Sequence, residues 1–284
     1  MADDLSAEAI ESWNVNAAFW DKRMGTKGNK WYNKLEIPVL ERLARVSPGT
    51  NALDLATGNG LVARWLAAQG AQVLATDVSP KMIEIATGYQ LGTESSAPPV
   101  TYQLLDLTNP DPVAWRDTLI AAEKVGGFEI VTMNMAAMDI STLQPLATML
   151  PKLLRPGGRF VVNTLHPVFH TTGGSRKIEL KVNEDNGATE PVYNFSLTHY
   201  MNKPPARGVA IEGQPKLQAG ISSIVYYHRP LHELLRPFFK AGLVLDALEE
   251  PTFEEPDEVQ KARLDADENF REMPPILGLR LRRF

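Results

Sequence analysis

Short apolar runs alternate with helical patterns between residues 51 and 165 of the chain. The apolar runs predict β-strands at 52–56, 72–76, 100–105, 128–133 and 159–165. The stretches with helical periodicity between them predict helices at 60–69, 80–89, 111–124 and 141–154. Strands joined by right-handed helical crossovers form a parallel sheet that is covered on both faces. The pattern therefore predicts a doubly wound α/β domain.

The flanking parts of the chain depart from this rhythm. Residues 1–48 predict helices without strands, and 166–228 are rich in glycine, proline and aromatic residues with weak periodicity. A stretch of that length is uncommon as a plain connection, so we interpret it as an inserted substrate cap. A helix at 230–241 and strands at 243–248 and 276–282 are predicted to complete the α/β domain. The charged stretch between those two strands predicts a solvated loop without chemistry.

These patterns divide the chain into three predicted regions. An N-terminal helical lid covers residues 1–48, and the substrate-cap insertion covers residues 166–228. The α/β domain is built from the two remaining segments, 49–165 and 229–284. This division predicts that the lid and the cap border one ligand site on the α/β domain.

Composition narrows the classes of protein that are possible. The chain has 284 residues, no cysteine and a formal net charge of -5. The absence of cysteine excludes disulfides and zinc–thiolate sites, and the acidic balance argues against a nucleic-acid partner. Apolar runs fall short of the roughly 20 residues that span a bilayer, and the acidic start is unlike a signal peptide. We therefore expect a cytoplasmic protein without a membrane or nucleic-acid partner and without a metal site.

A glycine-rich turn and two strand-end acids predict a nucleoside site. Gly58 and Gly60 follow the first strand, where glycine lets the backbone approach a ligand closely. Asp77 ends the second strand, at the spacing at which a carboxylate binds ribose hydroxyls. Asp106 ends the third strand and is placed to accept from the amine of adenine. A tight turn that merely requires glycine is the alternative interpretation of the loop alone.

Two cofactors fit these residues. Gly58, Gly60 and Ala63 satisfy G-x-G-x-x-G/A, which is typical of nicotinamide dinucleotide enzymes. However, Asp54 lies just before the loop, and a carboxylate there disfavours a pyrophosphate at the helix N-terminus. S-adenosyl-L-methionine has an adenosine, a sulfonium and an amino-acid end, but no phosphate. The acids therefore favour S-adenosyl-L-methionine over a dinucleotide.

Several segments resemble the class I S-adenosylmethionine-dependent methyltransferases. These segments are DLATGNG (54–60), ATDVSPKMIEIA (75–86), LLDL (104–107), FEIVTMNMAAMDI (128–140) and LLRPGGRFVVNTLHP (153–167). The resemblance is to the small-molecule group that includes quinone-biosynthesis and natural-product tailoring enzymes. It implies a seven-stranded sheet whose last strand, near 276–282, runs antiparallel to the others.

The resemblance also implies which residues hold the cofactor. The loop would wrap the methionine part, the strand-end acids would bind ribose and adenine, and the residues after the fourth strand would face the sulfonium. By matching position these residues are Asp54, Ala56, Thr57, Gly58, Gly60, Asp77, Val78, Met82, Asp106, Leu107, Asn134 and Met135. The family commonly has glycine where this chain has Ala56, and we expect the methyl group to tighten the pocket slightly.

Methyl transfer requires alignment of the acceptor and exclusion of water, and a base only when the acceptor must lose a proton. Histidine is suited to that role because it titrates near neutral pH. The candidates are His166, His170, His199 and His228, with Tyr200 beside them. His166 directly follows the fifth strand and is predicted to face the substrate, although a structural hydrogen-bonding role is the alternative for each histidine.

Aromatic residues of the N-terminal segment form a further group of candidates. Trp31 and Tyr32 are predicted to line the cofactor pocket, where an aromatic face attracts a sulfonium, and Trp20 belongs to the same segment. Anchoring the helices to the core is the alternative role.

We therefore predict methyl transfer to an O or N atom of a small apolar or aromatic metabolite. Three alternatives remain: a non-methylating reaction on the same fold, an NAD(P)-dependent oxidoreductase, and a non-catalytic cofactor-binding subunit.

Overall fold

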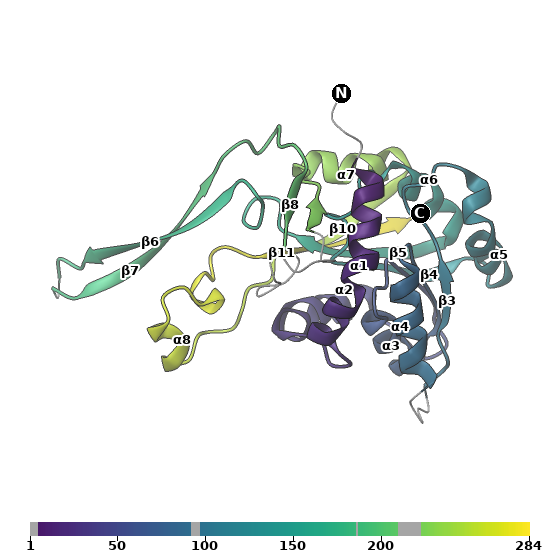
Figure 1. The fold of residues 1–284 in the computed structure, drawn as a ribbon, viewed down its shortest axis with the longest axis horizontal. Helices are drawn as coiled ribbons and strands as arrows, with labels where there is room; N and C mark the ends of the chain where they lie inside the picture. Colours follow the sequence, from purple (N-terminus) through teal and green to yellow (C-terminus); the bar gives the residue numbers. More distant parts are fainter. Residues whose placement is uncertain (1–4, 92–96, 186, 210–222) are drawn as a thin grey trace.

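The computed structural model describes residues 5–91, 97–185, 187–209 and 223–284 (Figure 1). Residues 1–4 of the predicted lid, and residues 186 and 210–222 of the predicted cap, lie outside the described residues. A seven-stranded sheet has the order β10-β11-β5-β4-β1-β2-β3. Its strands are β1 (Asn51–Leu55), β2 (Gln72–Asp77), β3 (Thr101–Leu104), β4 (Phe128–Asn134), β5 (Leu154–Leu165), β10 (Leu243–Glu249) and β11 (Ile276–Arg283).

The strand directions confirm the predicted fold. Strands β1 to β5 pair in parallel, whereas β11 pairs antiparallel with both β5 and β10. Strand β5 begins earlier than predicted, because its ladder resumes after residues 155–158 bulge out between the pairs Phe128–Leu154 and Ile130–Arg159. Gly157, with a φ of 76°, provides the left-handed conformation in that bulge.

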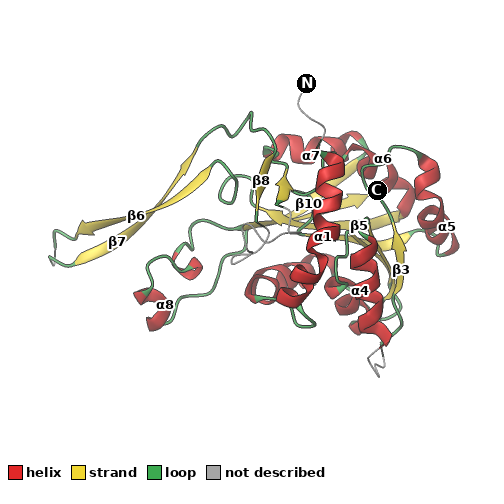
Figure 2. Ribbon diagram, in the orientation of Figure 1, coloured by secondary structure: helices red, strands yellow, loops and turns green. Residues whose placement is uncertain are grey.

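Helices cover both faces of the sheet (Figure 2). They are α3 (Leu61–Ala68), α4 (Pro80–Leu91), α5 (Arg116–Lys124), α6 (Gln144–Leu153) and α7 (Leu231–Lys240), with the short 3-10 helix η2 (Pro112–Trp115) before α5. Alternate residues of a strand point to opposite faces. Accordingly, Leu53 and Leu55 pack with the helices α5 to α7, whereas Ala52 packs with α3 on the other side. The hydrophobic clusters on the two faces fix the sheet between the helices, with the carboxyl ends of its parallel strands at one common edge.

The N-terminal residues are helical, as predicted. They form α1 (Ser6–Met24), the π-helical turn η1 (Tyr32–Glu36) and α2 (Ile37–Ala44). Val39, Leu40 and Leu43 bury α2 in the core beside β5 and β11. The π-helical turn η1 precedes this anchor directly. Such turns are rare and occur frequently at functional sites.

The described residues of the segment 166–228 form four strands that the sequence did not predict. They are β6 (Gly174–Val182), β7 (Thr189–Leu197), β8 (Ala206–Gly208) and β9 (Ile224–Tyr226). β6 and β7 form an antiparallel hairpin that extends away from the sheet (Figure 1). Leu180 and Val182 are exposed on it. Ile178, Leu180 and Val182 alternate with charged residues in β6, so the strand pattern was present in the sequence and was overlooked. No residue of β6 or β7 is buried, so the hairpin adds nothing to the core.

The charged stretch 249–275 is more ordered than predicted. It contains α8 (Glu258–Ala262) and the 3-10 helix η3 (Asp267–Asn269). Phe253, Phe270 and Met273 are buried, so a few apolar residues anchor the stretch. The prediction of a solvated loop is therefore wrong for this stretch, and its Asp267 lines the cavity described below.

Candidate active site

A cavity of about 910 Å³ opens at the carboxyl ends of β1, β2, β4 and β5. Ligand pockets occupy roughly 300–1,000 Å³, so this cavity lies near the upper end of that range. Helix α1, the turn η1 and residues 167–172 also border it. Of the fourteen residues predicted to bind the cofactor, Gly60 alone lies outside the lining.

The loop after β1 contains three residues with positive φ. They are Ala56 (51°), Gly58 (56°) and Gly60 (82°). A Cβ on Gly60 would lie 2.7 Å from the hydroxyl oxygen of Tyr102, so Gly60 is required by the turn and does not serve the cavity. Ala56 has adopted a conformation that costs an L-residue about 1–2 kcal/mol. Alanine in place of glycine at position 56 therefore strains the backbone, in addition to the expected narrowing of the pocket by its methyl group.

Asp54 is buried at the base of the cavity. Its two carboxylate oxygens accept hydrogen bonds from Thr57 Oγ1 at 2.6 Å and Thr132 Oγ1 at 2.7 Å. Burial raises the pKa of Asp54 to about 6, against the opposing effect of these hydroxyls. A cation in the cavity would favour the ionised carboxylate.

Asp77 connects the end of β2 to the glycine loop. One oxygen accepts from Gly58 N at 2.8 Å and the other from Ser79 N at 2.9 Å. Each oxygen retains a second lone pair, so the carboxylate can also accept from two vicinal hydroxyls. Asp106 is half-buried, and its Oδ1 accepts from Thr108 N at 2.8 Å and Thr108 Oγ1 at 2.7 Å.

Glu36 is a cavity residue that the sequence analysis missed. It ends the π-helical turn, is only 4% exposed, and accepts from Asn134 Nδ2 at 2.7 Å. Asn163 Nδ2 joins the same cluster by donating to the backbone oxygen of Glu36 at 3.0 Å and to Asn134 Oδ1 at 2.9 Å. Burial raises the pKa of Glu36 to about 7. The sequence feature that could have indicated a buried acid was the position of Glu36 between the apolar residues Leu35 and Ile37.

The N-terminal aromatic residues line the cavity. Trp31 donates from Nε1 to Asp267 Oδ2 at 3.2 Å and lies edge-on to the His170 ring at 5.2 Å. The hydroxyl of Tyr32 donates to Leu61 O at 3.3 Å, and Trp20 also faces the cavity. These positions agree with the prediction for Trp31 and Tyr32. Their role toward a cofactor stays a prediction.

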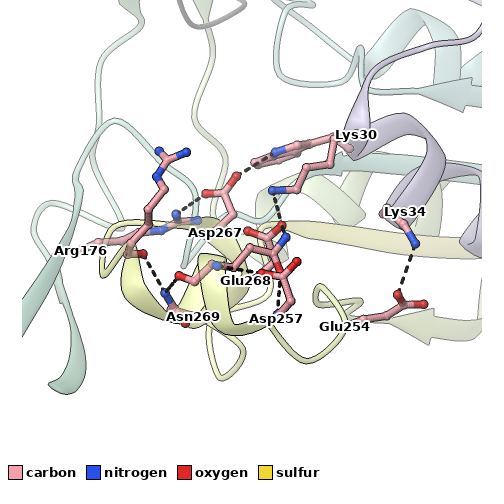
Figure 3. A network of polar contacts seen from close by, with 11 residues as sticks. Lys30, Lys34, Arg176, Glu254, Asp257, Asp267, Glu268 and Asn269 are labelled. Atoms are coloured by element: carbon pink, nitrogen blue, oxygen red, sulfur yellow. Dashed lines mark hydrogen bonds and ion pairs between the residues drawn. The ribbon is translucent and has the colours of Figure 1, made fainter. Parts of the chain in front are cut away.

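Ion pairs fasten this wall to segments that are distant in sequence (Figure 3). Asp267 pairs with Arg176 of β6 at 2.7 Å, and Lys30 pairs with Glu268 at 2.6 Å. A more exposed pair joins Lys34 to Glu254 at 3.3 Å. The network therefore connects the N-terminal segment, the β6–β7 hairpin and the stretch 249–275 around one side of the cavity.

The structure separates the four candidate histidines. His166, the leading candidate, lies outside the cavity lining, with a side chain that is 3% exposed. Its Nδ1 accepts from Val168 N at 3.1 Å and Phe169 N at 3.3 Å, so Nε2 carries the proton toward Glu250 at 2.9 Å. Both ring nitrogens are thus engaged in the fold, and the expectation that His166 faces the substrate is not met. His199 is exposed and also lies outside the lining.

His170 and His228 do line the cavity. His228 Nε2 lies 2.7 Å from Tyr200 O and its Nδ1 lies 2.9 Å from Thr171 Oγ1, so this ring is held by two partners. Tyr200 itself is outside the lining, and its hydroxyl accepts from Leu231 N at 2.9 Å. Burial lowers the pKa of His170 to about 4. His170 is therefore neutral at physiological pH.

Asp139 is a second acid that the sequence analysis missed. It follows β4, lines the cavity and is 9% exposed. Its Oδ1 is buried and has no hydrogen-bond partner within the described part of the chain. Burial raises the pKa of Asp139 well above the ordinary aspartate value. As with Glu36, the signal was a carboxylate within an apolar run, MAAMDI (135–140).

Known proteins are similar to this chain in sequence and in fold. Residues 53–160 match the family profile described as a methyltransferase domain. A ubiquinone biosynthesis O-methyltransferase from Chromobacterium violaceum is 29% identical over 148 residues, which cover 52% of this chain and 58% of that protein. The chain therefore spans about half the length of the curated relatives it matches.

Solved structures extend the similarity over most of the chain. An S-adenosylmethionine-dependent methyltransferase from Mesorhizobium loti superposes with a TM-score of 0.57 at 23% identity, covering 87% of this chain and 96% of that one. Magnesium protoporphyrin IX methyltransferase from Synechocystis, with bound S-adenosylmethionine, gives a TM-score of 0.55 at 12% identity over 100% and 99% of the chains. The shared architecture is the doubly wound methyltransferase fold.

The fold and the strand-end site define a nucleoside-binding protein of the Rossmann-like class. Residues 53–160 are similar to a methyltransferase domain, and the fold is that of S-adenosylmethionine-dependent methyltransferases. The cofactor of that family, S-adenosyl-L-methionine, is the one that the sequence predicted. Within the described residues, helices long and apolar enough to cross a membrane are absent.

Proposed function

We propose that this protein transfers the methyl group of S-adenosyl-L-methionine to an O or N atom of a small, largely apolar or aromatic metabolite. The main support is that Asp54, Asp77 and Asp106, from three successive strand ends, face one cavity. Asp77 would accept from the ribose hydroxyls and Asp106 from the adenine amine. Asp54 and Glu36 would stabilise the positively charged methionine end.

The protein would act mainly by positioning and by exclusion of water. The sulfonium already activates the methyl group, so the attacking atom need only be held in line with the carbon–sulfur bond. Trp31 and Tyr32 would close the cofactor side, and residues 167–172 with the end of β9 would close the acceptor side. In this proposal residues 1–48 form a lid over the cofactor, residues 166–228 form a substrate cap, and the protein acts in the cytoplasm.

An apolar acceptor is supported by the lining beyond the sulfonium side. Met135, Met138, Ile140 and Leu165 contribute apolar surface there, and methionine adapts to irregular shapes. The relatives named as ubiquinone biosynthesis O-methyltransferases are in keeping with methylation of an oxygen atom. The formal net charge of -5 argues against a nucleic-acid acceptor.

Calorimetric titration with S-adenosylhomocysteine and, separately, with NADH tests the cofactor. We expect binding of the first and none of the second. Asp106→Ala should weaken binding roughly 10- to 100-fold, because a hydrogen bond to a charged group contributes about 1.5–3 kcal/mol. The exposed Asp117 provides the control Asp117→Ala. Equal affinity of the Asp106→Ala variant would refute the adenine assignment, and binding of NADH alone would refute the proposed function.

A further inference from the structure

Asp139 differs from the other acids of the cavity in the hydrogen bonding of its carboxyl group. The carboxylates of Asp54, Asp77 and Asp106 accept from nearby hydroxyls or backbone N–H groups, and Glu36 accepts from Asn134. Asp139 Oδ1 is buried without a hydrogen bond from the described residues. An unpaired buried carboxyl group is unfavourable. Its presence on a cavity wall therefore suggests that a bound ligand donates the missing hydrogen bond to Asp139.

The backbone around Asp139 is held firmly by hydrogen bonds. Arg229 donates from Nη1 to Ala137 O at 2.8 Å and from Nη2 to Ile140 O and Ser141 O, the last at 2.9 Å. Tyr227 N also donates to Met138 O at 2.7 Å. These contacts fix the loop from both sides of Asp139. The carboxyl group is thus presented to the cavity at a defined position.

Asp139 lies on the acceptor side of the cavity. Its loop follows β4, next to β5 in the sheet, whereas Asp77 and Asp106 end β2 and β3 on the other side of β1. Thr164 at the end of β5 contacts Met138. Burial and, to a smaller extent, the negative charge of Asp139 raise the pKa of Tyr226 in β9. The guanidinium of Arg229 donates to four backbone oxygens, those of Ala137, Ile140 and Ser141 in this loop and that of Tyr227.

We propose that Asp139 contacts the acceptor and removes the proton from its attacking hydroxyl or amine group. This inference rests on the proposed methyl transfer and names a residue and an acceptor class for it. The lone pair of the attacking O or N forms the new bond to the methyl carbon. The electrons of the carbon–sulfur bond remain on sulfur, which becomes a neutral thioether. The proton of the O–H or N–H group passes to the Asp139 carboxylate.

The surroundings make Asp139 a stronger base than an ordinary aspartate. Burial raises its pKa, whereas a sulfonium bound in the same cavity would stabilise its ionised form. The titratable and charged groups around its loop are Tyr226, Tyr227 and Arg229. Burial raises the pKa of Tyr226, so this phenol stays neutral when Asp139 ionises.

The same placement selects the class of acceptor. A neutral hydroxyl or amine on an apolar body can donate to Asp139. An acceptor carrying a carboxylate or phosphate at the reacting position would be repelled by Asp139 and by Glu36, which shares the cavity. We therefore expect phenol-type or amine acceptors and no carboxylate acceptors.

The test compares wild type, Asp139→Asn and the exposed control Asp117→Asn. Asparagine preserves the shape of the side chain but removes its basic function. Each protein is titrated with S-adenosylhomocysteine, then with catechol or benzoate in the presence of that product. Transfer of a labelled methyl group from S-adenosylmethionine to catechol is measured between about pH 6 and about pH 9, the range in which a tuned base titrates.

We expect all three proteins to bind S-adenosylhomocysteine equally. Asp139→Asn should lose roughly 10²–10⁴-fold in catechol methylation, the range for removal of a general base, and should lose the wild-type rise of rate with pH. The control should match wild type in rate and pH profile. Benzoate should bind less tightly than catechol to wild type, and Asp139→Asn should reduce or abolish that preference.

Two results would overturn the inference while leaving the proposed function intact. One is an unchanged catechol rate and pH profile in Asp139→Asn. The other is a wild-type complex with S-adenosylhomocysteine that does not bind catechol, or that prefers benzoate. Failure of wild type to bind S-adenosylhomocysteine would instead refute the proposed function itself.

Discussion

Glu36→Gln is the most informative single change, because it separates ionisation from shape. The glutamate is buried, and its Oε2 accepts from Asn134 Nδ2 at 2.7 Å. A glutamine amide oxygen can accept the same hydrogen bond. The substitution therefore removes the charge that Glu36 acquires on ionising and keeps the contact with Asn134.

The expected effect on stability follows from the raised pKa of Glu36. Burial raises it from the ordinary 4.5 to about 7, so the folded protein binds more protons than the unfolded chain between these values. Stability of wild type accordingly falls as the pH rises through this window. At 1.36 kcal/mol per pKa unit, the full loss is about 3 kcal/mol once the pH exceeds the folded-state pKa.

The assay is urea unfolding of the cofactor-free proteins from about pH 4.5 to about pH 8. Glu36→Gln and wild type should have similar stability at the acidic end. At the alkaline end the variant should be more stable by up to about 3 kcal/mol. Glu123→Gln, an exposed substitution on α5, is the matched control and should follow wild type at every pH.

A stability difference between Glu36→Gln and wild type that does not change with pH would refute the reasoning. Such a result would mean that Glu36 ionises in the folded protein as easily as in the unfolded chain. Saturating S-adenosylmethionine provides a second readout, because a bound cation should favour ionised Glu36. The stability advantage of the variant should then shrink, and its affinity for the cofactor should fall.

Three further predictions concern the loop, the ion-pair network and the histidines. Ala56→Gly should relieve a backbone strain of about 1–2 kcal/mol, partly offset by the larger entropy of glycine in the unfolded chain. The melting temperature should therefore rise slightly and cofactor binding should be retained, whereas a lower melting temperature would contradict this. Asp267→Ala removes the partner of Trp31 and Arg176. It should weaken cofactor affinity and speed amide hydrogen exchange at residues 30–36. Unchanged exchange would show that the ion-pair network does not hold this wall of the cavity. His166→Ala should lower the melting temperature but leave catalysis in the folded protein intact, because both ring nitrogens serve the fold; loss of turnover at full stability would restore His166 as a catalytic candidate.

The sequence alone determined the sheet and the edge of the sheet at which the cavity lies. Strands, crossover helices and the positive-φ loop are local features, since each depends on the periodicity of one segment or on a glycine at one turn. Parallel strands also place their carboxyl ends at a common edge. Asp54, Asp77 and Asp106 could therefore be assigned to one site before any distance between them was known.

The acceptor side depended on contacts between segments far apart in the chain. His166 and His170 are four residues apart, yet one is engaged with Glu250 outside the cavity and the other faces Trp31. Neither Glu36 nor Asp139 was assigned a role from the sequence. Burial raises the pKa values of both acids, and at Glu36 the hydrogen bond from Asn134 opposes that rise. Tertiary packing decides burial and pairing, so only the structure could single out these two acids.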